Sequence, residues 1–422
     1  MNTIDDYMED SDFISSLSDE IIKNESDLNY TWDSDSSYLG FHTFSVLRTE
    51  LSYLASNLIK DAKMFRDKTN EIDIITDKKH PDVYWIVYND RRGIYWRIWS
   101  SHTWGTFDIS CIEATINPKV FAGIKDFVSA ATLDDLKTIE ERFNYESNRL
   151  SEIIGDFSKF NLNRGDYCVN FDLERLNHPC SVKQQMILFN RGDIPIHYER
   201  YKEYDKKVSH RFISPKESFY LKSKSVNLNT YGRYAHLFNN DPNNPCLEAS
   251  KNIIRFEVQC KSRKLYPMKR LLKEKTDSSI ELINEMFSDE YCRDIVDGYY
   301  KRVIMRGDYY TLKRARRLIQ DHGFRLSKET RLLFALELVN ECRSIAVAKS
   351  TLEGKALDEF RQSLRELTSE GINPVTIPRE WSIPHIPNLL NSYYEMIDET
   401  ENRKHREQFE SECMKEVIKR KV

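Results

Sequence analysis

The feature of this sequence that most constrains its fold is a change of hydrophobic period near Pro267. Before this proline, short aromatic and β-branched runs alternate in the manner of strands, as in VYWIVYN (83–89) and NIIRFEVQCK (252–261). After it, apolar residues recur every three or four positions, which is typical of helices, and only the proline-rich stretch 371–387 interrupts them. We therefore expect an α+β domain followed by an α-helical domain.

Charge sets a third region apart. Residues 1–45 contain eleven Asp or Glu and one Lys, although the whole chain has a net charge of only −4. Apolar residues are too sparse there for a core, so we expect an acidic, largely disordered tail over 1–45. The α+β domain is expected over 46–267, and the α-helical domain, a candidate for DNA binding, over 268–422.

Local patterns predict several elements within the α+β domain. Apolar spacing of three and four indicates a helix over 46–66, and residues 90–93 fit a hairpin turn between two strands. Pro118 opens a helical stretch that breaks near 131–132, and a later strand is expected over 166–173.

Several function classes are excluded because their sequence signals are missing. No run of about 18 apolar residues exists to span a membrane, and the acidic N-terminus lacks the apolar region of a signal peptide. The eight cysteines are scattered without a CxxC pair, which predicts reduced thiols in the cytoplasm and no zinc site or disulfide framework. The motifs GxxxxGK[ST], GxGxxG, HExxH and GxSxG do not occur.

One basic segment indicates a phosphate-rich partner. Residues 205–270 contain fourteen Lys or Arg against five Asp or Glu. A local positive field of this size suits a polyanion. A solvated lysine-rich face is the alternative.

Three expected strands each carry a carboxylate among apolar residues, namely Glu113, Asp166 and Glu257. A carboxylate in such surroundings is costly unless it is paired or binds a metal ion. Since Mg²⁺ and Mn²⁺ prefer oxygen ligands, three carboxylates on neighbouring strands of one sheet predict a site for either cation. The alternative is that each carboxylate faces solvent on the polar side of its strand.

The stretch SFYLKSKSVNLNTYGRY (218–234) supplies candidate nucleophiles in Tyr231 and Tyr234. A tyrosine phenolate can attack phosphorus to give a covalent phosphotyrosyl intermediate, and a nearby cation then stabilises the charge on the phosphate. The alternative is that tyrosine is common in strands, since this chain has 23 tyrosines. The cations of the stretch are Lys222, Lys224 and Arg233.

The helical domain contains a pair of helices that resembles a helix-turn-helix. A helix is predicted over 309–324 with Thr311 as its cap, and a second over 327–342 after a turn at Gly323. Such a pair is suited to contact duplex DNA, whereas the alternative is an ordinary helical pair with a solvated basic face. The cations on the first helix are Lys313, Arg314, Arg316 and Arg317.

Taken in order, these motifs resemble the replication initiators of rolling-circle phages and plasmids. The similarity is greatest to the filamentous-phage nicking protein and its Firmicute relatives on plasmids and integrative elements, and it covers about residues 107–390. The segments that carry it are CIEATINPKVFAG (111–123), RGDYCVNFDL (164–173), NRGDIPIHYERYKEYDKK (190–207), SFYLKSKSVNLNTYGRYAHL (218–237), NIIRFEVQCKSRKL (252–265) and LTSEGINPVTIPREW (367–381).

The resemblance implies an activity and its partners. It implies site-specific nicking of one DNA strand at an origin, with Tyr231 joined to the 5′ phosphate, a free 3′-OH that primes synthesis, and a required Mg²⁺ or Mn²⁺. Origin DNA, as duplex and as single strand, is the implied partner, and host helicase and polymerase are further ones. A non-catalytic DNA-binding regulator of plasmid or phage replication is the alternative.

The resemblance also implies a fold, an antiparallel sheet with helices on one face, similar to the RRM-like core of HUH-type nucleases. In that setting Trp96, Trp99 and Trp104 either stack on single-stranded bases or pack in the core.

Some positions depart from the family pattern. Arg233 stands where the family usually has a lysine, which keeps the charge and changes the geometry. His236 replaces a usual Glu or Gln, and no His-hydrophobe-His pair is present, so carboxylates have to carry more of the metal binding. Arg255 lies in the hallmark Arg-Phe-Glu strand and is expected to bind DNA, and Tyr234 is a candidate second nucleophile.

Overall fold

The computed structural model describes residues 38–51, 54–76, 80–90, 92–103, 107–123, 129–200, 218–240, 242–244, 246–273 and 278–400. These residues divide into two compact units. The first comprises residues 38–170, 197–200 and 218–298, and the second comprises residues 171–196 and 299–400, each within the described ranges. This division differs from the predicted boundary at 267, because 268–298 belongs with the sheet and 171–196 belongs with the C-terminal helices.

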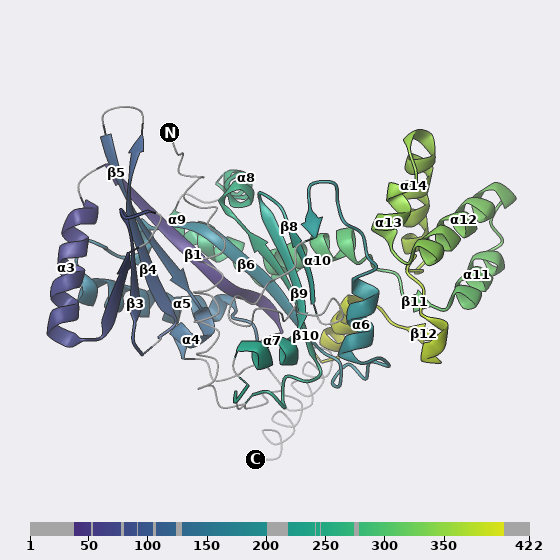
Figure 1. Ribbon diagram of the computed structural model, residues 1–422, viewed down its shortest axis with the longest axis horizontal. Coiled ribbons are helices and arrows are strands. Elements are labelled where there is room, and N and C mark those ends of the chain that lie inside the picture. The colour runs from purple at the N-terminus through teal and green to yellow at the C-terminus, as the bar shows by residue number, and fades with distance from the viewer. Residues whose placement is uncertain are drawn as a thin grey trace, which may run out of the picture. The chain divides into compact units, whose positions relative to one another are not determined.

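A ten-stranded sheet is the framework of the first unit (Figure 1). The strand order is β2-β3-β4-β5-β1-β6-β10-β9-β8-β7, and pairing is antiparallel from β2 to β6 and from β10 to β7. The large antiparallel sheet and the helical C-terminal part are therefore confirmed. The strands are β1 Leu39–Leu51, β2 Ile72–Thr76, β3 Val83–Tyr88, β4 Ile94–Thr103, β5 Phe107–Ile116, β6 Asn161–Asp172, β7 Glu199–Arg200, β8 Ser218–Lys222, β9 Val226–Gly232 and β10 Ile253–Cys260.

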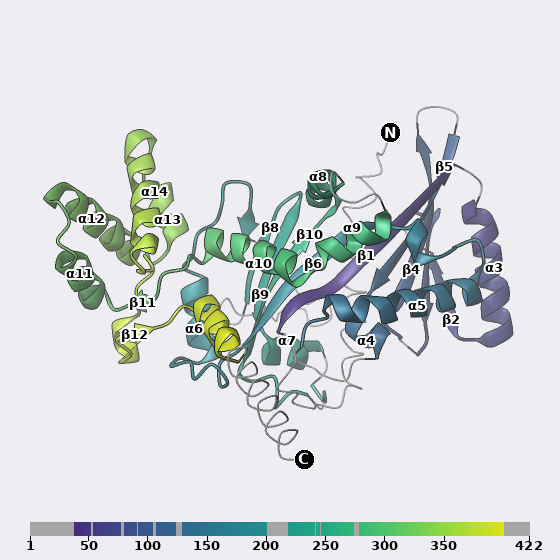
Figure 2. The ribbon, with the colours of Figure 1, turned by 180° about the vertical axis from the view of Figure 1, so that it is seen from behind.

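Helices α5 (Leu133–Leu150), α9 (Ser279–Met286) and α10 (Asp289–Val303) lie across one face of this sheet (Figure 2). Aromatic contacts fix them there: the Trp96 and Phe143 ring centroids are 5.1 Å apart, and those of Phe41 and Phe287 are 4.1 Å apart. We call this side the apolar face. The other helices of the first unit are α3 Leu54–Thr69, α4 Pro118–Ala122, α7 Arg233–Asn240, α8 Ser262–Leu272 and the short η2 Phe157–Lys159.

The N-terminal side of the sheet corrects two predictions. The predicted helix 46–66 is wrong over its first part, because Leu39–Leu51 is β1 and helix α3 starts only at Leu54. The described residues 38–45 belong with the sheet and are buried. The prediction of a disordered tail over 1–45 is therefore wrong for these eight residues. Residues 1–37, the rest of that prediction, lie outside the described residues.

Other local predictions are confirmed. The turn between β3 and β4 holds Gly93 at a φ of +80°, a conformation that favours glycine. The break in the helical stretch after Pro118 is the interval between α4 and α5, and Thr132 is the N-cap of α5. The strand predicted over 166–173 begins earlier, since β6 runs from Asn161 to Asp172.

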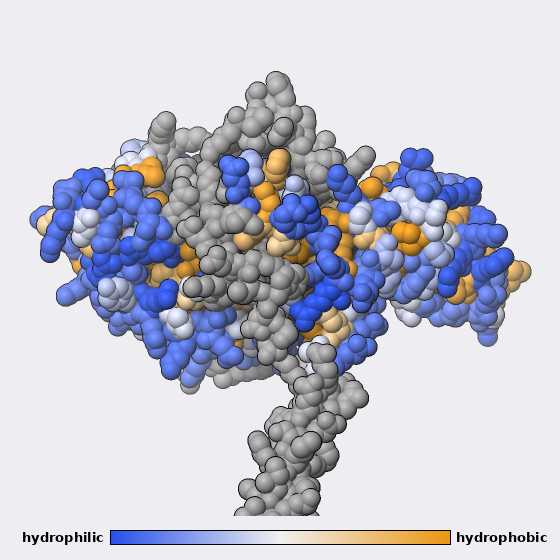
Figure 3. Space-filling view, turned by 90° about the horizontal axis from the view of Figure 1, so that it is seen from below, coloured by the Kyte–Doolittle hydropathy of each residue, from blue (hydrophilic) through white to orange (hydrophobic). Residues whose placement is uncertain are grey.

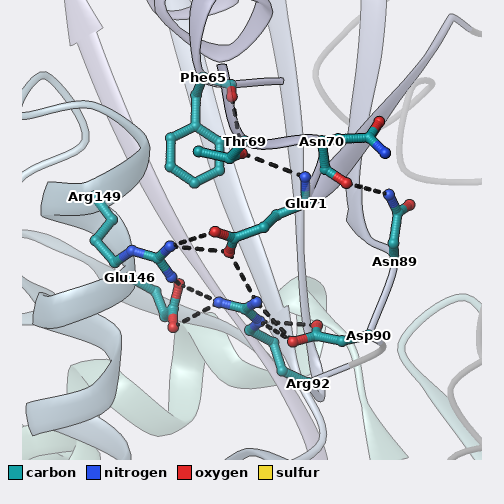
Figure 4. A network of polar contacts seen from close by, with 9 residues as sticks. All are labelled: Phe65, Thr69, Asn70, Glu71, Asn89, Asp90, Arg92, Glu146 and Arg149. Carbon is teal, nitrogen blue, oxygen red and sulfur yellow. Dashed lines mark hydrogen bonds and ion pairs between the residues drawn. The ribbon is translucent and has the colours of Figure 1, made fainter. Parts of the chain in front are cut away.

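A network of charged side chains joins the start of β2, the β3–β4 turn and α5 (Figure 4). Arg92 lies at its centre and bonds both oxygens of Glu146 at 2.9 and 3.0 Å and Glu71 Oε2 at 3.0 Å. Arg149 of α5 binds the same Glu71 at 2.7 and 2.9 Å. The hydrogen bond with Arg149 lowers the pKa of Glu71.

The second unit is mainly helical. Its core contains Leu188, Ile319, Leu336 and Leu364, contributed by four different helices. Its elements are α6 Val182–Phe189, β11 Tyr309–Tyr310, α11 Leu312–Asp321, α12 Leu326–Cys342, α13 Ile345–Ser350, α14 Gly354–Ser369, η3 Arg379–Trp381 and β12 His385–Ile386.

The described surface in Figure 3 is largely hydrophilic, with small hydrophobic patches. None of the helices in the described ranges is long and apolar enough to cross a membrane. The cysteines that the structure describes are free thiols, and all of them except the half-buried Cys342 are buried.

Candidate active site

The sheet has a polar face, opposite the apolar face, where β6, β10 and β9 lie side by side. Alternate residues of a strand point to the same side, so one set of alternate positions on each strand forms this face. Two pairs of residues that oppose each other across β9 and β10 are Asn227 with Gln259 and Asn229 with Glu257. The residues that define the polar face are Arg164, Asp166, Cys168 and Asn170 on β6, Arg255, Glu257 and Gln259 on β10, and Asn227, Asn229 and Tyr231 on β9.

Asp166 and Glu257 are buried carboxylates on the neighbouring strands β6 and β10. Arg164 donates hydrogen bonds of 2.9 and 2.5 Å to the two carboxylate oxygens of Asp166. Asn229 Nδ2 donates a 3.0 Å hydrogen bond to Glu257 Oε1. Each acid is therefore oriented by a neighbour on the polar face.

The two carboxylates also interact electrostatically. Burial raises the pKa of Asp166, and Arg164 opposes that rise. Burial raises the pKa of Glu257 as well, and the negative charge of Asp166 raises it further, whereas Arg255 opposes the rise. The negative charge of Asp166 disfavours the charge on Glu257. A shared proton, or a cation bound between the oxygens of the two carboxylates, would therefore stabilise the pair electrostatically.

Glu113 lies in a separate cluster. Ser45 Oγ and Asn163 Nδ2 donate hydrogen bonds of 2.7 and 2.8 Å to Glu113 Oε1, and Arg97 lies 3.8 Å from Oε2. Strand β1 separates β5 from β6, so Glu113 is offset from Asp166 by two strand spacings, about 10 Å. The three predicted metal ligands therefore do not meet at one point.

A shift in the register of β1 and β6 explains how Asn163 reaches Glu113. Ser45 pairs with Arg164 but the next residue, Val46, pairs with Leu162, so Asn163 is an extra residue on β6. A bulge of this kind re-aims the side chain of the extra residue. Glu113 therefore accepts hydrogen bonds from two neutral donors and has Arg97 as its ion-pair partner.

The donor set was tested against the predicted cation. Mg²⁺ in phosphate-processing sites is commonly held by one or two carboxylates together with substrate phosphates, and Asp166 and Glu257 fit that pattern. Arg164 already supplies one positive charge to Asp166. In the part of the chain that the structure describes, no group of three or more His, Cys, Asp or Glu is arranged to hold a metal ion. A cation here would therefore rest on two protein carboxylates and not on the predicted three.

Tyr231 lies in the same face, diagonal to Glu257 and two strands away from Asp166. It is directly opposite Arg255 across β9 and β10, and it follows Asn229 by two residues. Residues in this diagonal relation to Glu257 have Cα atoms about 7–8 Å apart, which is within reach of a tyrosine side chain. The Tyr231 ring centroid is 4.5 Å from that of His236 and 6.3 Å from that of Tyr220.

Arg255, directly opposite Tyr231, is fully buried. Arg255 Nε donates a 2.8 Å hydrogen bond to Asn170 Oδ1, and Arg233 follows directly after β9. Burial raises the pKa of the Cys168 thiol to about 11, and the charges of Arg255, Lys119 and Arg233 oppose that rise. Along β10 the polar face thus runs from Gln259 and Glu257 to Arg255, which lies opposite Tyr231.

Tyr234 is in a different setting from Tyr231. Strand β9 ends at Gly232, so Tyr234 belongs to α7 and not to a continuing strand. Its ring stacks on Phe238 with a centroid distance of 6.0 Å, and Lys251 Nζ lies 5.9 Å from its centroid.

The remaining predicted DNA-binding residues fall in two places. Lys222 ends β8 and is half-buried, and Lys224 is exposed in the following turn. On α11, Ala315 and Ile319 are buried. Thr311 is the N-cap of α11, although its side chain makes no capping hydrogen bond. The four predicted cations of α11 are all exposed: Lys313, Arg314, Arg316 and Arg317.

Two of the tryptophans are core residues. Trp96 and Trp99 are both buried, which confirms packing over base stacking for them. Trp104 lies outside the described residues.

Arg164 and Asn229, which orient the two carboxylates of the polar face, were not among the predicted site residues. Arg164 stands two positions before Asp166, so strand alternation alone was a sufficient signal for it. Asn229 stands two positions before Tyr231 and had the same signal.

No protein-family model and no curated protein matches this sequence. Function is therefore inferred from the residues of the polar face and from α11.

Proposed function

We propose that this chain is a metal-dependent DNA nickase that initiates rolling-circle replication, with Tyr231 as its nucleophile. The observation that supports it most is the order of groups on the polar face. Tyr231 lies opposite Arg255 and diagonal to the carboxylate of Glu257, and phosphoryl transfer to a tyrosine uses both kinds of group.

The chemical step follows from this arrangement. The Tyr231 phenol oxygen attacks phosphorus and forms a bond to the 5′ phosphate, while the bond from phosphorus to the 3′ oxygen breaks. The phenol proton passes to solvent, and the leaving 3′ oxygen takes up a proton to become the free 3′-OH. Arg255, directly opposite Tyr231, and Arg233, two residues beyond it, stabilise the negative charge that develops on the phosphate oxygens.

Asp166 and Glu257 are the residues that would hold Mg²⁺ or Mn²⁺. When bound, such a cation neutralises charge on the phosphate and orients it. Asn229 holds Glu257, and Arg164 holds Asp166, so both carboxylates keep fixed orientations.

Helix α11 supports a role on duplex DNA. Its four exposed cations project from a helix whose other side is buried, and Arg316 among them pairs with Glu337 at 2.7 Å. Lys224, exposed in the turn after β8, adds a further cation for the backbone of a single strand. Host helicase and polymerase are proposed as further partners, at the strand that the free 3′-OH extends.

The test is a covalent adduct that survives SDS. Wild-type protein and Mn²⁺ are incubated with a pool of labelled single strands with randomised sequence, and the adduct is recovered and sequenced. Tyr231→Phe should give no adduct while its affinity for the pool stays within about twofold, because only the nucleophilic oxygen is removed.

Tyr234→Phe is the matched control, since it removes the same hydroxyl from a tyrosine three residues away, and it should keep the adduct. An adduct that persists in Tyr231→Phe and disappears in Tyr234→Phe would transfer the role to Tyr234. Circular dichroism of both variants checks that they are folded.

A second candidate function is a non-catalytic DNA-binding regulator of plasmid or phage replication. The observation that favours it is that Arg164 already neutralises Asp166 and that Glu113 is engaged elsewhere. Wild-type protein that binds DNA but gives no adduct with Mn²⁺ or Mg²⁺ would favour this function.

A further inference from the structure

Helix α8 carries positive charge directly after β10. Its span, Ser262–Leu272, contains four Lys or Arg and no Asp or Glu, and Lys273 follows it as the C-cap. The helix overlaps the end of the basic segment 205–270, and the proposed function gives none of its side chains a role.

The apolar side of α8 is used within the protein. Leu265, Met268 and Leu272 are buried, and their spacing of three and four residues puts them on one side of the helix. On its flank, Lys269 Nζ donates a 2.8 Å hydrogen bond to the carbonyl oxygen of Leu162 at the start of β6. The helix is therefore fixed to the sheet, and its opposite side faces outward.

Tyr266, Arg270 and Lys273 form one row on this outward side, since steps of four and three residues keep side chains on the same face of a helix. The Tyr266 side chain is 71% exposed, and within the described ranges its ring contacts no other ring and no cation. Arg270 and Lys273 are exposed as well, and neither has an ion-pair partner among those residues.

The cations of the row act together. Burial lowers the pKa of Lys269, and the charge of Lys273 lowers it further. The field at this end of α8 is therefore positive, and it attracts an anion to the side where Arg270 and Lys273 are exposed.

The kind of partner follows from the side chains. An exposed aromatic ring beside unpaired cations suits single-stranded nucleic acid, because a base stacks on the ring and the cations neutralise phosphates. A lipid surface fits less well, since a helix that lies on a membrane inserts its apolar side, and in α8 that side is buried in the protein.

The row is also close along the chain to the proposed nicking site. Tyr266 follows Glu257 of β10 by nine residues. The rise per residue of a strand and of a helix limits the separation of their Cα atoms to about 25 Å. A short stretch of extended nucleic acid spans that distance.

We propose that Tyr266, Arg270 and Lys273 bind a single DNA strand beyond the nicking site, with a base stacked on the Tyr266 ring and phosphates at the two cations. The proposal rests on the proposed function for the identity of the strand as the substrate, but the binding itself is measurable without nicking.

The test measures the affinity of the full chain for two labelled strands of equal length in EDTA, so that no metal-dependent chemistry takes place. One is oligothymidylate, and the other is an abasic strand with the same phosphates and no bases. Tyr266→Ala should weaken binding to oligothymidylate about tenfold, which is within the range for loss of one stacked base, and change binding to the abasic strand less than about twofold. Tyr266→Phe keeps the ring and should bind both strands like wild type.

Tyr145 of α5 is the matched aromatic control. It is 62% exposed, but the guanidinium of Arg149 lies 5.6 Å from its ring centroid. Tyr145→Ala should therefore leave both affinities unchanged. If a folded Tyr266→Ala binds oligothymidylate like Tyr145→Ala, or loses affinity equally for the two strands, stacking on Tyr266 is ruled out.

Arg270→Gln tests the phosphate contact independently of the ring. It should reduce the slope of log K against log salt by about 0.7, the value for one lost contact to a single strand. Arg66→Gln is its control, because Arg66 of α3 already pairs with Asp67 at 2.8 Å. Equal slopes for the two variants, both folded by circular dichroism, would overturn the contact.

Vesicles that contain phosphatidylserine test the lipid alternative. If Tyr266→Ala loses the binding of wild type to these vesicles and keeps its affinity for oligothymidylate, the row binds lipid and the proposal is wrong. If wild type gives no adduct with Mn²⁺ but the expected binding pattern is found, the proposed function fails and the strand-binding row stands.

Discussion

Glu257 and Glu113 show how partners decide what a buried carboxylate does. Both are largely buried, and both accept a hydrogen bond from an asparagine. Glu113 also accepts from Ser45 and has Arg97 nearby, so its charge is compensated. Glu257 lies beside a second carboxylate, Asp166, which makes its charge less favourable and gives it a use for a cation.

This difference predicts that replacing the glutamate with glutamine lowers the nicking rate at position 257 and leaves it nearly unchanged at position 113. Glu257→Gln should lower Mn²⁺-supported nicking by more than about 100-fold, since even residues that only orient metal ligands cost about 10–100-fold. Glu113→Gln should leave the rate within about twofold. The measurement is the initial rate of adduct formation over a Mn²⁺ titration, and equal losses in the two variants would contradict the assignment of Glu257 as a ligand.

At the residue scale, strand alternation was enough to place Asp166, Glu257 and Tyr231 on one face once their strands were known. It could not separate Glu113 from them, because the sequence does not show that β1 inserts between β5 and β6. That insertion is a tertiary event, and it changes the distance between carboxylates by a whole strand spacing.

At the scale of elements, β1 is the strand that joins the two parts of the sheet. It pairs with β5 on one side and β6 on the other, and Phe41 exchanges backbone hydrogen bonds of 3.0 and 3.1 Å with Ala131 just before α5. Gly40 permits this close approach, because a Cβ there would lie 2.2 Å from the Ala131 carbonyl oxygen.

Gly40→Ala should therefore destabilise the fold by about 1–3 kcal/mol, the usual range for an overpacked site. The matched control is Gly165→Ala on the paired strand β6, where a Cβ would meet only the Tyr167 ring at 3.5 Å, an ordinary contact. Urea unfolding followed by circular dichroism compares them. Equal midpoints for the two variants would show that the approach of Ala131 does not limit the residue at position 40.

The same strand shows why the sequence placed a helix over 46–66. Residues of β1 such as Val46 and Leu47 are spaced among polar residues in a way that fits a helical period as well as a strand, and short runs are ambiguous. Pairing with β5 and β6 decided the outcome. The longer helices of the C-terminal part were predictable because their period persists over several turns.

At the scale of the whole molecule, charge is unevenly distributed along the chain. Residues 1–37 carry all eleven acidic residues of the region predicted as a tail, whereas the following residue 38 already belongs with the sheet. A truncation that removes the acidic stretch and spares β1 must therefore end at 37 and not at 45.

Deletion of 1–37 should strengthen binding to a scrambled duplex at low salt, because acidic side chains compete with phosphate for the same cations. The gain should shrink at physiological ionic strength, where screening acts over about 8 Å. Titration of full-length and truncated protein at two salt concentrations measures this. Equal affinities at low salt would leave the acidic stretch without a competitive role.

The burial of Tyr231 has a consequence for kinetics. Its exposed fraction is 6%, and Arg255, directly opposite it, is more deeply buried still. A polymer as wide as a nucleic-acid strand can reach such a hydroxyl only in molecules that have opened locally, and the apparent dissociation constant is then the intrinsic one divided by the open fraction. Mild denaturant or a higher temperature should thus speed the binding of a DNA strand at Tyr231, at conditions that do not yet unfold the protein.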